Sequence, residues 1–191
     1  DLGLDVTLID PELNPGGVCL YRGCIPTKSL LHISRIVKES AEAGEMGIEF
    51  TPPEINLQKV RQWKDKVVKK LTGGLGQLVK TRKINYTRGY ARFTDNKRIE
   101  IKAQGQDDYS IAFKNAIIAT GVKPMIPDNI ELDSKDIVDS STALELQDVP
   151  QHLLVIGAGY IGLEMATIYK SLGSKVSVVE MTENFMPGMD K

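Results

Sequence analysis

Apolar residues recur along the chain at two different spacings, which distinguish strands from helices. Residues 153–156 (LLVI) are a short apolar run of the kind that forms a buried strand. Residues 27–44 and 54–82 carry apolar positions at helical spacing instead, and the first of these predicted helices ends at Gly44. The second contains Gly73–Gly74, so we expect an interruption there, with its lysines on a solvated face.

Between these helices and the strand at 153–156, the pattern changes to alternation. From Ile84 to Phe113, apolar and polar residues alternate in runs separated by turn-forming residues, which predicts a small β-meander. Residues 115–121 (NAIIATG) are apolar enough for a buried strand. Residues 123–150 contain prolines and acids and are expected to link two domains.

One segment of the chain occurs twice. Residues 1–10 (DLGLDVTLID) align with residues 171–180 (SLGSKVSVVE), so that Asp10 corresponds to Glu180. In both copies Leu-Gly is typical of a helix end with a glycine cap, and a short β-branched strand closed by an acid follows it. A strand, a glycine turn and an amphipathic helix precede the second copy only. We therefore expect the chain to be an internal fragment of a longer protein.

The second copy contains the most specific ligand-binding pattern. Gly157, Gly159 and Gly162 form GxGxxG directly after the run at 153–156, and Glu180 ends the next strand. The first glycine permits a tight turn, the second lets the backbone approach a pyrophosphate, and the third permits close helix-to-strand packing. The helix N-terminus attracts phosphate. Glu180 would accept a hydrogen bond from a ribose 2′-hydroxyl and repel a 2′-phosphate, so NAD is favoured over NADP.

These residues also have simpler interpretations. A glycine-rich turn of an α/β protein need hold no ligand, and Asp10 need only end a strand. Because Asp10 is the repeat counterpart of Glu180, we treat it as a candidate ligand for the ribose of a second nucleotide. Two nucleotide sites in one chain suggest electron transfer between two cofactors.

Composition and charge narrow the classes of function. The chain has 24 Lys and Arg against 25 Asp and Glu, and 41% of its residues are hydrophobic, which is enough for a core. Balanced charge provides no global field to draw nucleic acid or an anionic membrane, and we expect neither partner. No apolar run approaches the roughly 18 residues of a membrane span, and no signal peptide opens the chain. We expect a cytoplasmic protein, or one of the mitochondrial matrix if the host is a eukaryote.

Both cysteines lie in residues 16–28 (GGVCLYRGCIPTK). Extended backbone would separate Cys19 from Cys24 by roughly 16 Å and a regular helix by about 7.5 Å of rise, whereas a disulfide needs Cα atoms within roughly 4.4–6.8 Å. Gly23 and Pro26 supply the means for an irregular turn that could close the pair. A disulfide that closes so short a loop adds limited stability to the fold, so one here suits redox exchange better than a structural role.

Two other uses of the cysteines stay open. With His32 they could supply three metal ligands, but no fourth ligand is near in sequence, and we expect no metal. They could also be inert buried thiols.

Several segments resemble those of one enzyme family. They are GGVCLYRGCIPTKSLLH, AIIATGVKPMIP, VDSSTALEL and LLVIGAGYIGLEMATIYKSLGSKVSVVE. Together they resemble the flavin-dependent pyridine nucleotide disulfide oxidoreductases over essentially the whole chain. The CxxxxC segment followed by IPTK is very specific to that family. Glutamate is usual there at the position of Asp10, so this residue is a mild departure that keeps the charge.

The resemblance implies roles for four candidate catalytic residues. Cys19 corresponds to the thiol that attacks the substrate disulfide, and Cys24 to the thiol next to the flavin. Lys28 corresponds to a lysine near the flavin N5, whose cation stabilises reduced flavin and a thiolate. Glu164 matches the glutamate that pairs with this lysine, and Tyr160 resembles an aromatic gate over the flavin. From the residues alone, Glu164 could be an ordinary surface acid and Tyr160 a packing residue.

The resemblance also implies the fold and the cofactors. We expect FAD and NAD in α/β domains of the FAD/NAD(P)-binding Rossmann-like class, with three layers, a parallel sheet plus a β-meander, and truncation at both ends. Residues 1–148 would form a partial FAD-binding domain and residues 149–191 the first βαβ portion of an NAD-binding domain. The candidate cofactor-binding residues are Asp10, Gly16, Gly17, Lys28, Ala119, Thr120, Gly121, Gly157, Gly159, Tyr160, Ile161, Gly162 and Glu180.

The implied function is electron transfer from dihydrolipoamide through the cysteine pair and FAD to NAD. The expected partner is a lipoamide-bearing protein or a small disulfide, and the full-length protein is expected to be a homodimer. In the family a histidine of the partner subunit serves the thiols as a base. Neither His32 nor His152 lies in the matching motif, so we expect little turnover from the 191-residue piece alone. A glutathione or mercuric reductase of the same family and a non-catalytic dinucleotide-binding module are the alternatives.

Overall fold

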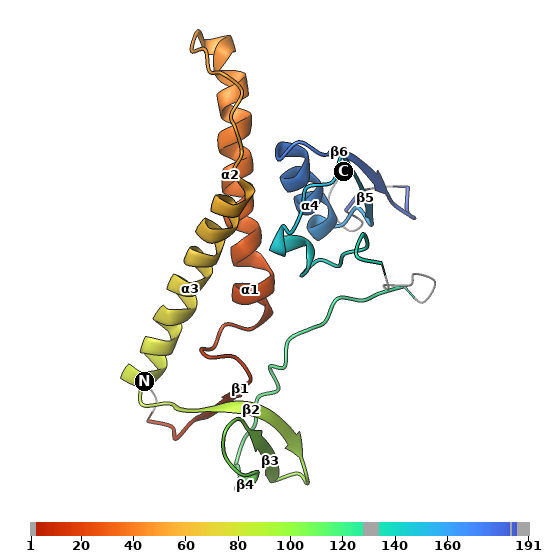
Figure 1. The fold of residues 1–191 in the computed structure, drawn as a ribbon. Coiled ribbons are helices and arrows are strands. Elements are labelled where there is room, and N and C mark those ends of the chain that lie inside the picture. Colours follow the sequence, from red (N-terminus) through yellow and green to blue (C-terminus); the bar gives the residue numbers. More distant parts are fainter. Residues whose placement is uncertain (1–2, 128–133, 184, 187–191) are drawn as a thin grey trace. The chain divides into compact units, whose positions relative to one another are not determined.

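The computed structural model describes residues 3–127, 134–183 and 185–186, and Figure 1 shows its helices and strands. The chain divides into two compact units. The first consists of Asp1–Val18 and Lys69–Val122, and the second of Cys19–Val68 and Lys123–Lys191. The secondary structure is α/β with parallel strand pairs, which confirms the predicted fold class. Each unit combines two separate stretches of sequence, and the domain boundary between residues 148 and 149 stays a prediction.

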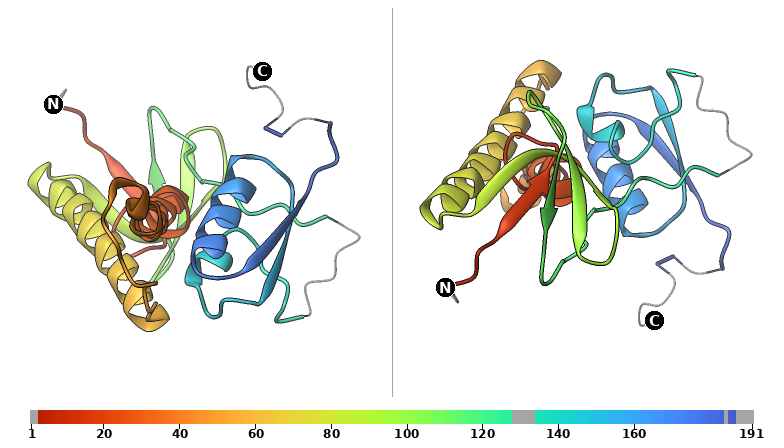
Figure 2. Two further views of the ribbon diagram at one scale, coloured as in Figure 1. Left: turned by 90° about the horizontal axis from the view of Figure 1, so that it is seen from above. Right: turned by 90° about the horizontal axis from the view of Figure 1, so that it is seen from below.

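The first unit contains a four-stranded sheet in the order β1 (Thr7–Asp10), β2 (Asn85–Phe93), β3 (Arg98–Ala103) and β4 (Tyr109–Ala112). The first half of β2 pairs in parallel with β1, and its second half pairs antiparallel with β3, which in turn pairs with β4. Both views in Figure 2 show β1 and β2 side by side. The predicted β-meander is confirmed.

Gly89 lies where β2 changes from one partner strand to the other. It is buried, and a Cβ built on it would overlap the backbone carbonyl of Lys102. Glycine is therefore required by the close approach of two backbones. Beyond it, Ile99 and Ile101 are buried, and the rings of Phe93 and Phe113 meet edge to face with centroids 5.7 Å apart.

The second unit contains the predicted βαβ segment. Strands β5 (His152–Ile156) and β6 (Lys175–Val179) pair in parallel, and α4 (Tyr160–Ser171) connects them and packs against both, as Figure 2 shows. Gly173, with φ +112°, ends the helix, and its N–H donates to the carbonyl of Lys170 at 3.1 Å. This confirms the glycine helix end in the second repeat copy.

The first repeat copy has the corresponding geometry where it is described. Gly3 has φ +65°, so it shares the left-handed conformation of Gly173, and β1 follows it as β6 follows Gly173. Leu2 lies outside the described residues.

The redox segment, residues 16–28 with both cysteines, lies on α1 (Gly17–Arg22) and the start of α2 (Cys24–Glu42), and α3 (Leu57–Thr81) follows later in the chain. The prediction that Gly44 ends α2 is wrong. Gly44 lies inside η1 (Ala43–Met46), and the left-handed residue that closes this turn is Gly47, with φ +83°.

The predicted interruption of α3 is also wrong, because the helix is continuous through Gly73 and Gly74. Each glycine costs about 1 kcal/mol relative to alanine, a penalty that a 25-residue helix can absorb. The prediction that its lysines form a solvated face fails at Lys64, which is only 7% exposed.

Residues 115–121 are not a strand, contrary to the prediction. Ile117 is 93% exposed and Ile118 is 71% exposed. A strand requires a neighbour for its backbone hydrogen bonds, and no described segment pairs with these residues.

The core of the second unit includes part of the predicted link between domains. Residues of η2 (Ala143–Glu145) and Leu146 pack with α2 and α4. The buried residues of this core cluster are Leu30, Ala143, Leu144, Leu146, Met165, Ile168 and Tyr169. The segment at 143–146 is thus a core element of this unit.

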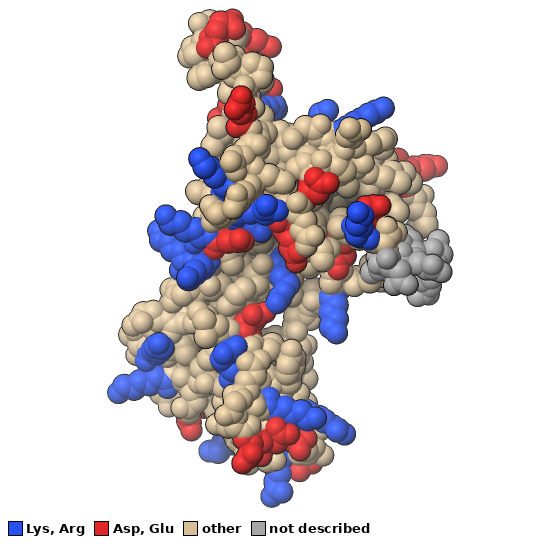
Figure 3. Space-filling view, viewed as in Figure 1, with Lys and Arg blue, Asp and Glu red and all other residues tan. Residues whose placement is uncertain are grey.

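Charges of both signs are interspersed on the face of the molecule drawn in Figure 3. None of the described helices combines the length and the apolar composition that crossing a bilayer requires. In the same described ranges, no three His, Cys, Asp or Glu side chains gather as metal ligands would.

Candidate functional site

The glycine loop between β5 and α4 has the geometry that the sequence predicts. Gly157 has φ +102°, which favours glycine, and its N–H donates to the carbonyl of Val179 at 2.8 Å. A Cβ on Gly162 would overlap the Gly157 carbonyl oxygen and would lie 3.2 Å from Val155 Cγ1. The turn and packing roles of these two glycines are confirmed.

Gly159 is the N-cap residue of α4, with φ −71° and ψ 173°. Among the described residues, apart from its neighbours in the chain, no atom lies within 4 Å of the point where its Cβ would be, so the backbone is open to approach at this position. Tyr160 and Ile161 begin the helix and are 70% and 44% exposed. The first N–H groups of a helix have no partner within it, so this open end can receive an anion. These ligand contacts stay predictions.

Glu180 lies directly after β6 and holds the glycine loop. Its Oε2 accepts the N–H of Ala158 at 2.7 Å, and its Oε1 accepts the N–H of Thr182 at 2.9 Å and the Thr182 hydroxyl at 3.1 Å. The N–H groups of Thr182 and Ala158 lower the pKa of this carboxyl below its usual value of 4.5. Glu180 is therefore an ionised acceptor at neutral pH, beside the loop predicted to hold a pyrophosphate.

Asp10 occupies the equivalent place in the other repeat copy. It ends β1, is half-buried, and its Oδ1 accepts the N–H of Glu12 at 2.8 Å. Glu180 accepts the N–H of the residue two positions on in the same way. The two acids thus share one local arrangement, which supports the repeat.

Two segments proposed to line FAD come together in the first unit. Gly17 has φ +56° and opens α1 after Gly16, and Gly121 has φ +74°. A Cβ on Gly121 would lie 3.3 Å from Val18 Cγ2, so the end of the ATG segment contacts the residue after Gly17. Ala119 and Thr120 are exposed.

The redox segment bends between α1 and α2. Gly23, with φ −142° and ψ −115°, separates the two helices, and its carbonyl accepts the N–H of Thr27 at 3.0 Å. Pro26 lies in the first turn of α2, where its missing N–H costs nothing. The irregular turn predicted from Gly23 and Pro26 is confirmed.

Both cysteines are exposed free thiols, and they interact with each other. A side-chain hydrogen bond with Cys24 raises the pKa of the Cys19 thiol above 9.0, and burial and the charge of Cys24 raise it further. The backbone N–H of Cys24 and the cation of Lys28 act in the opposite direction. The two cysteines on either side of the bend are therefore close enough to interact, while the disulfide itself stays a prediction.

Lys28 and Glu164 lie on two helices that pack together. Helix α2 contacts α4 through the shared core and through a hydrogen bond that the Ser171 hydroxyl donates to Ser34 Oγ at 2.7 Å. Lys28 is exposed and Glu164 is half-buried. No ion pair joins the two side chains in the described part of the chain, so their pairing stays a prediction.

Sequence reasoning missed the role of Thr182. A threonine two residues after an acid is a common source of local hydrogen bonds, so the sequence did contain a signal for this role.

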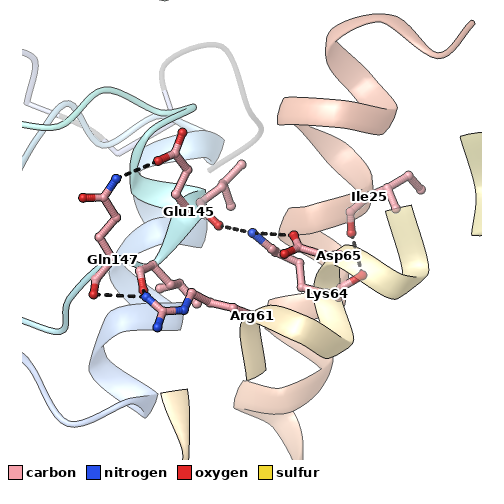
Figure 4. Close-up of polar contacts among 9 residues, drawn as sticks. Ile25, Arg61, Lys64, Asp65, Glu145 and Gln147 are labelled. Carbon is pink, nitrogen blue, oxygen red and sulfur yellow. Dashed lines mark hydrogen bonds and ion pairs between the residues drawn. The ribbon is translucent and has the colours of Figure 1, made fainter. Parts of the chain in front are cut away.

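Sequence reasoning also missed two cations of α3 that hold the segment around η2 (Figure 4). Arg61 Nη1 donates to the carbonyls of Leu146 at 3.1 Å and Gln147 at 3.2 Å. Lys64 Nζ donates to the carbonyl of Leu144 at 2.9 Å and lies 3.2 Å from Asp65 Oδ1. These bonds join residues at least 80 positions apart in the chain, so no local pattern could have indicated them.

A comparison with protein families identifies one that extends over the whole chain. The family described as pyridine nucleotide-disulphide oxidoreductase matches residues 1–191. The chain is 46% identical over 191 residues to the dihydrolipoyl dehydrogenase of Vibrio cholerae serotype O1 and 45% identical to that of Buchnera aphidicola subsp. Schizaphis graminum. Each alignment covers 100% of this chain and 40% of the relative, so the chain spans about 40% of the length of these proteins.

Solved structures agree with the family match. The HOCl-induced flavoprotein disulfide reductase RclA from Escherichia coli is 28% identical, with a TM-score of 0.80 over 99% of this chain and 39% of RclA. LpdA from Mycobacterium tuberculosis has a TM-score of 0.86 at 22% identity, over 97% of this chain and 41% of LpdA, which shows the shared fold.

Proposed function

The chain belongs to the pyridine nucleotide-disulphide oxidoreductase family, and on that premise we propose that the full-length protein is a dihydrolipoamide dehydrogenase, transferring electrons from dihydrolipoamide to NAD. The observation that carries the proposal is the interaction of the Cys19 and Cys24 thiols across the bend at Gly23. Two thiols held in this way can form and open a disulfide, which is the chemistry that a dithiol substrate requires.

The overall reaction balances as a two-electron oxidation. Dihydrolipoamide loses two electrons and two protons as its thiols join in a disulfide, NAD⁺ gains a hydride, and one proton is released. The cysteine disulfide opens to accept the electrons and closes again when it passes them on, so the protein returns to its starting state. FAD, when bound, supplies the ability to exchange electrons with thiols and hydride with nicotinamide.

The described residues fit both cofactors. Around the proposed NAD site, the left-handed Gly157, the open Gly159 and the ionised Glu180 offer a tight turn, room for a pyrophosphate and a ribose acceptor. Around the proposed FAD site, Asp10 offers a second carboxylate at a strand end, and Gly121 lies against the residue after Gly17.

Each residue of the redox segment has its own task in this proposal. Cys19 exchanges with the substrate sulfur, and Cys24 is the thiol adjacent to flavin. Lys28 favours the thiolate form because its cation lowers the pKa of Cys19. The raised pKa of Cys19 keeps it a thiol at neutral pH, so exchange needs a base, which we propose a partner subunit supplies in a homodimer.

The choice of dihydrolipoamide as substrate is supported by the relatives. The proteins that match at 44–46% identity across the whole chain are named dihydrolipoyl dehydrogenase. We propose a lipoamide-bearing protein as the partner, and location in the cytoplasm stays a prediction.

Anaerobic titration of the full-length protein tests the proposal. Addition of dihydrolipoamide is expected to produce a long-wavelength absorption band from a thiolate next to the flavin, and Cys24→Ser is expected to abolish it. A protein that binds FAD and shows no such band would be a non-catalytic dinucleotide-binding module.

A substrate panel on the same protein distinguishes the members of the family. We expect turnover with dihydrolipoamide and NAD⁺, and a strong preference for NADH over NADPH in the reverse direction. Turnover with glutathione disulfide or mercuric ion in place of lipoamide would assign a different reductase.

A further inference from the structure

The loop between Asp10 and Gly16 connects two parts of the proposed FAD site, and the meander holds it from one side. The Tyr86 hydroxyl donates to the carbonyl of Glu12 at 3.0 Å, and Gln104 Nε2 donates to the carbonyl of Pro11 at 3.4 Å. Both bonds fix the first half of the loop, close to Asp10. They leave the second half, which leads to Gly16, to be fixed by other contacts.

Asn14 fixes that second half against α3. A Cβ built on Gly76 would overlap Oδ1 and Cγ of Asn14 and would lie 3.4 Å from its Cβ. The Asn14 side chain therefore occupies the volume that a side chain at Gly76 would take. Gly76 is buried, whereas Gly73 and Gly74 are exposed, and beyond their own helix backbone no atom of the described residues lies within 4 Å of their would-be Cβ atoms.

Of the three glycines in α3, only Gly76 has a neighbouring side chain among the described residues that explains why glycine is needed. A glycine inside a helix is unfavourable, and at residues 73 and 74 no neighbour in the described part of the chain requires it. At residue 76 the absence of a side chain lets Asn14 lie on the helix backbone. A methyl group there would force Asn14 to rotate about χ1 and leave the helix, because its amide is too short to bend around the methyl.

We propose that Gly76 is a positioning residue for the FAD site: by seating Asn14, it sets the path of the loop from Asp10 to Gly16. This inference rests on the proposed function, since it concerns the same flavin site. Gly76 itself touches no reacting group, and it acts through Asn14. The loop path determines where Asp10 and the Gly16–Gly17 backbone lie relative to each other, so a displaced loop separates two sets of flavin contacts.

The test compares FAD dissociation constants of the full-length protein and its variants, measured by reconstitution of the apoprotein. Gly76→Ala is expected to weaken FAD binding about tenfold, which corresponds to about 1.4 kcal/mol. Gly73→Ala and Gly74→Ala make the same chemical change on the same helix in open space, and they are expected to bind FAD as the wild type does.

A double variant isolates the contact. In the Asn14→Ala background the methyl of Gly76→Ala meets no amide, so adding Gly76→Ala is expected to change FAD binding less than twofold. If Gly76→Ala alone fails to fold, the inference requires that Asn14→Ala/Gly76→Ala fold and bind FAD.

The remaining outcomes contradict either the proposed function or the role of Gly76. A wild-type protein without affinity for FAD overturns the proposed function, and this inference with it. A wild type that binds FAD, with Gly76→Ala equal to it or with the same loss in both backgrounds, overturns the inference alone. A lower thermal midpoint in Gly76→Ala with an unchanged FAD dissociation constant also overturns it, because the role would then be purely structural.

Discussion

At the scale of single residues, contact with Cys24 makes the Cys19 thiol harder to ionise. Cys19 donates a hydrogen bond toward Cys24, which favours the protonated form of Cys19 and raises its pKa above 9.0. A group whose pKa is raised in the folded state favours folding at low pH, and this contribution is lost as the pH rises through the raised pKa.

Removing the acceptor is expected to make Cys19 easier to ionise. In the reduced protein, Cys24→Ala should lower the pKa of Cys19 toward 9.0, because the hydrogen bond and the charge of Cys24 both disappear. The pH profile of iodoacetamide alkylation at Cys19 measures this shift, and its midpoint should move to lower pH. Lys28→Met serves as the opposite control and should move the midpoint to higher pH, since Lys28 lowers this pKa. An unchanged or raised midpoint in Cys24→Ala would contradict the hydrogen bond.

Thr182 gives a second prediction at this scale. Thr182→Val keeps the shape of the side chain and removes the hydroxyl that Glu180 Oε1 accepts at 3.1 Å. In the full-length protein we expect this loss to cost about 0.5–1.5 kcal/mol, or roughly 2- to 10-fold in the dissociation constant of NADH. Thr182→Ser retains the hydroxyl and should bind NADH as the wild type does. Equal affinities in the Val and Ser variants would show that the hydroxyl does not position Glu180.

At the scale of elements, α3 performs two unlike tasks along its length. Its first half donates hydrogen bonds from Arg61 and Lys64 to carbonyls around η2, and its second half seats Asn14 at Gly76. The hydrogen bond from Arg61 also holds the carbonyl of Leu146. The side chain of Leu146 is completely buried, and its backbone is in the left-handed conformation at φ 51°. That conformation costs roughly 1–2 kcal/mol for a bulky residue, and burial of the side chain offsets it.

Lys64→Met is expected to destabilise the protein. Methionine preserves most of the buried stem, but it leaves the carbonyl of Leu144 without the Nζ donor at 2.9 Å. We expect a loss of about 1–3 kcal/mol in the free energy of unfolding, measured by urea denaturation with an unchanged m-value. The exposed Lys66→Met on the same helix is the matched control and should change stability by no more than about 0.5 kcal/mol. Equal effects of the two substitutions would refute the buried hydrogen bond.

The elements show which features of the fold a sequence can predict. The β5–α4–β6 unit, its glycine turn and the bend at Gly23 follow from neighbouring residues, and they were predicted correctly. The strand at 115–121 was predicted wrongly, since a strand depends on a partner that the apolar pattern does not specify. The continuity of α3 through Gly73–Gly74 was missed because helix propensity is a weak preference that the rest of a long helix overrides.

At the scale of the molecule, each compact unit is assembled from two stretches of sequence that lie far apart. Helix α2, which carries Cys24 and Lys28, shares one core with α4, which carries Glu164. The contacts missed from the sequence are of this long-range kind. Lys64 with Leu144 and Asn14 with Gly76 are examples, because only the folded chain brings them together. The two residues of the predicted Lys28–Glu164 pair likewise lie on helices, α2 and α4, that pack directly against each other.

A double-mutant cycle in the full-length protein tests whether Lys28 and Glu164 are coupled. Lys28 lowers the pKa of the Cys19 thiol, so Lys28→Met should raise it. Glu164→Gln removes a negative charge that offsets Lys28, so that variant alone should lower the thiol pKa. If the two side chains pair, the effect of Glu164→Gln should shrink in the Lys28→Met background by more than about 0.5 kcal/mol, or roughly 0.4 pKa unit. The alkylation profile of Cys19 supplies the pKa in all four proteins. Additive effects within that margin would show that Glu164 acts independently of Lys28, and the role carried over from the family would not hold for this chain.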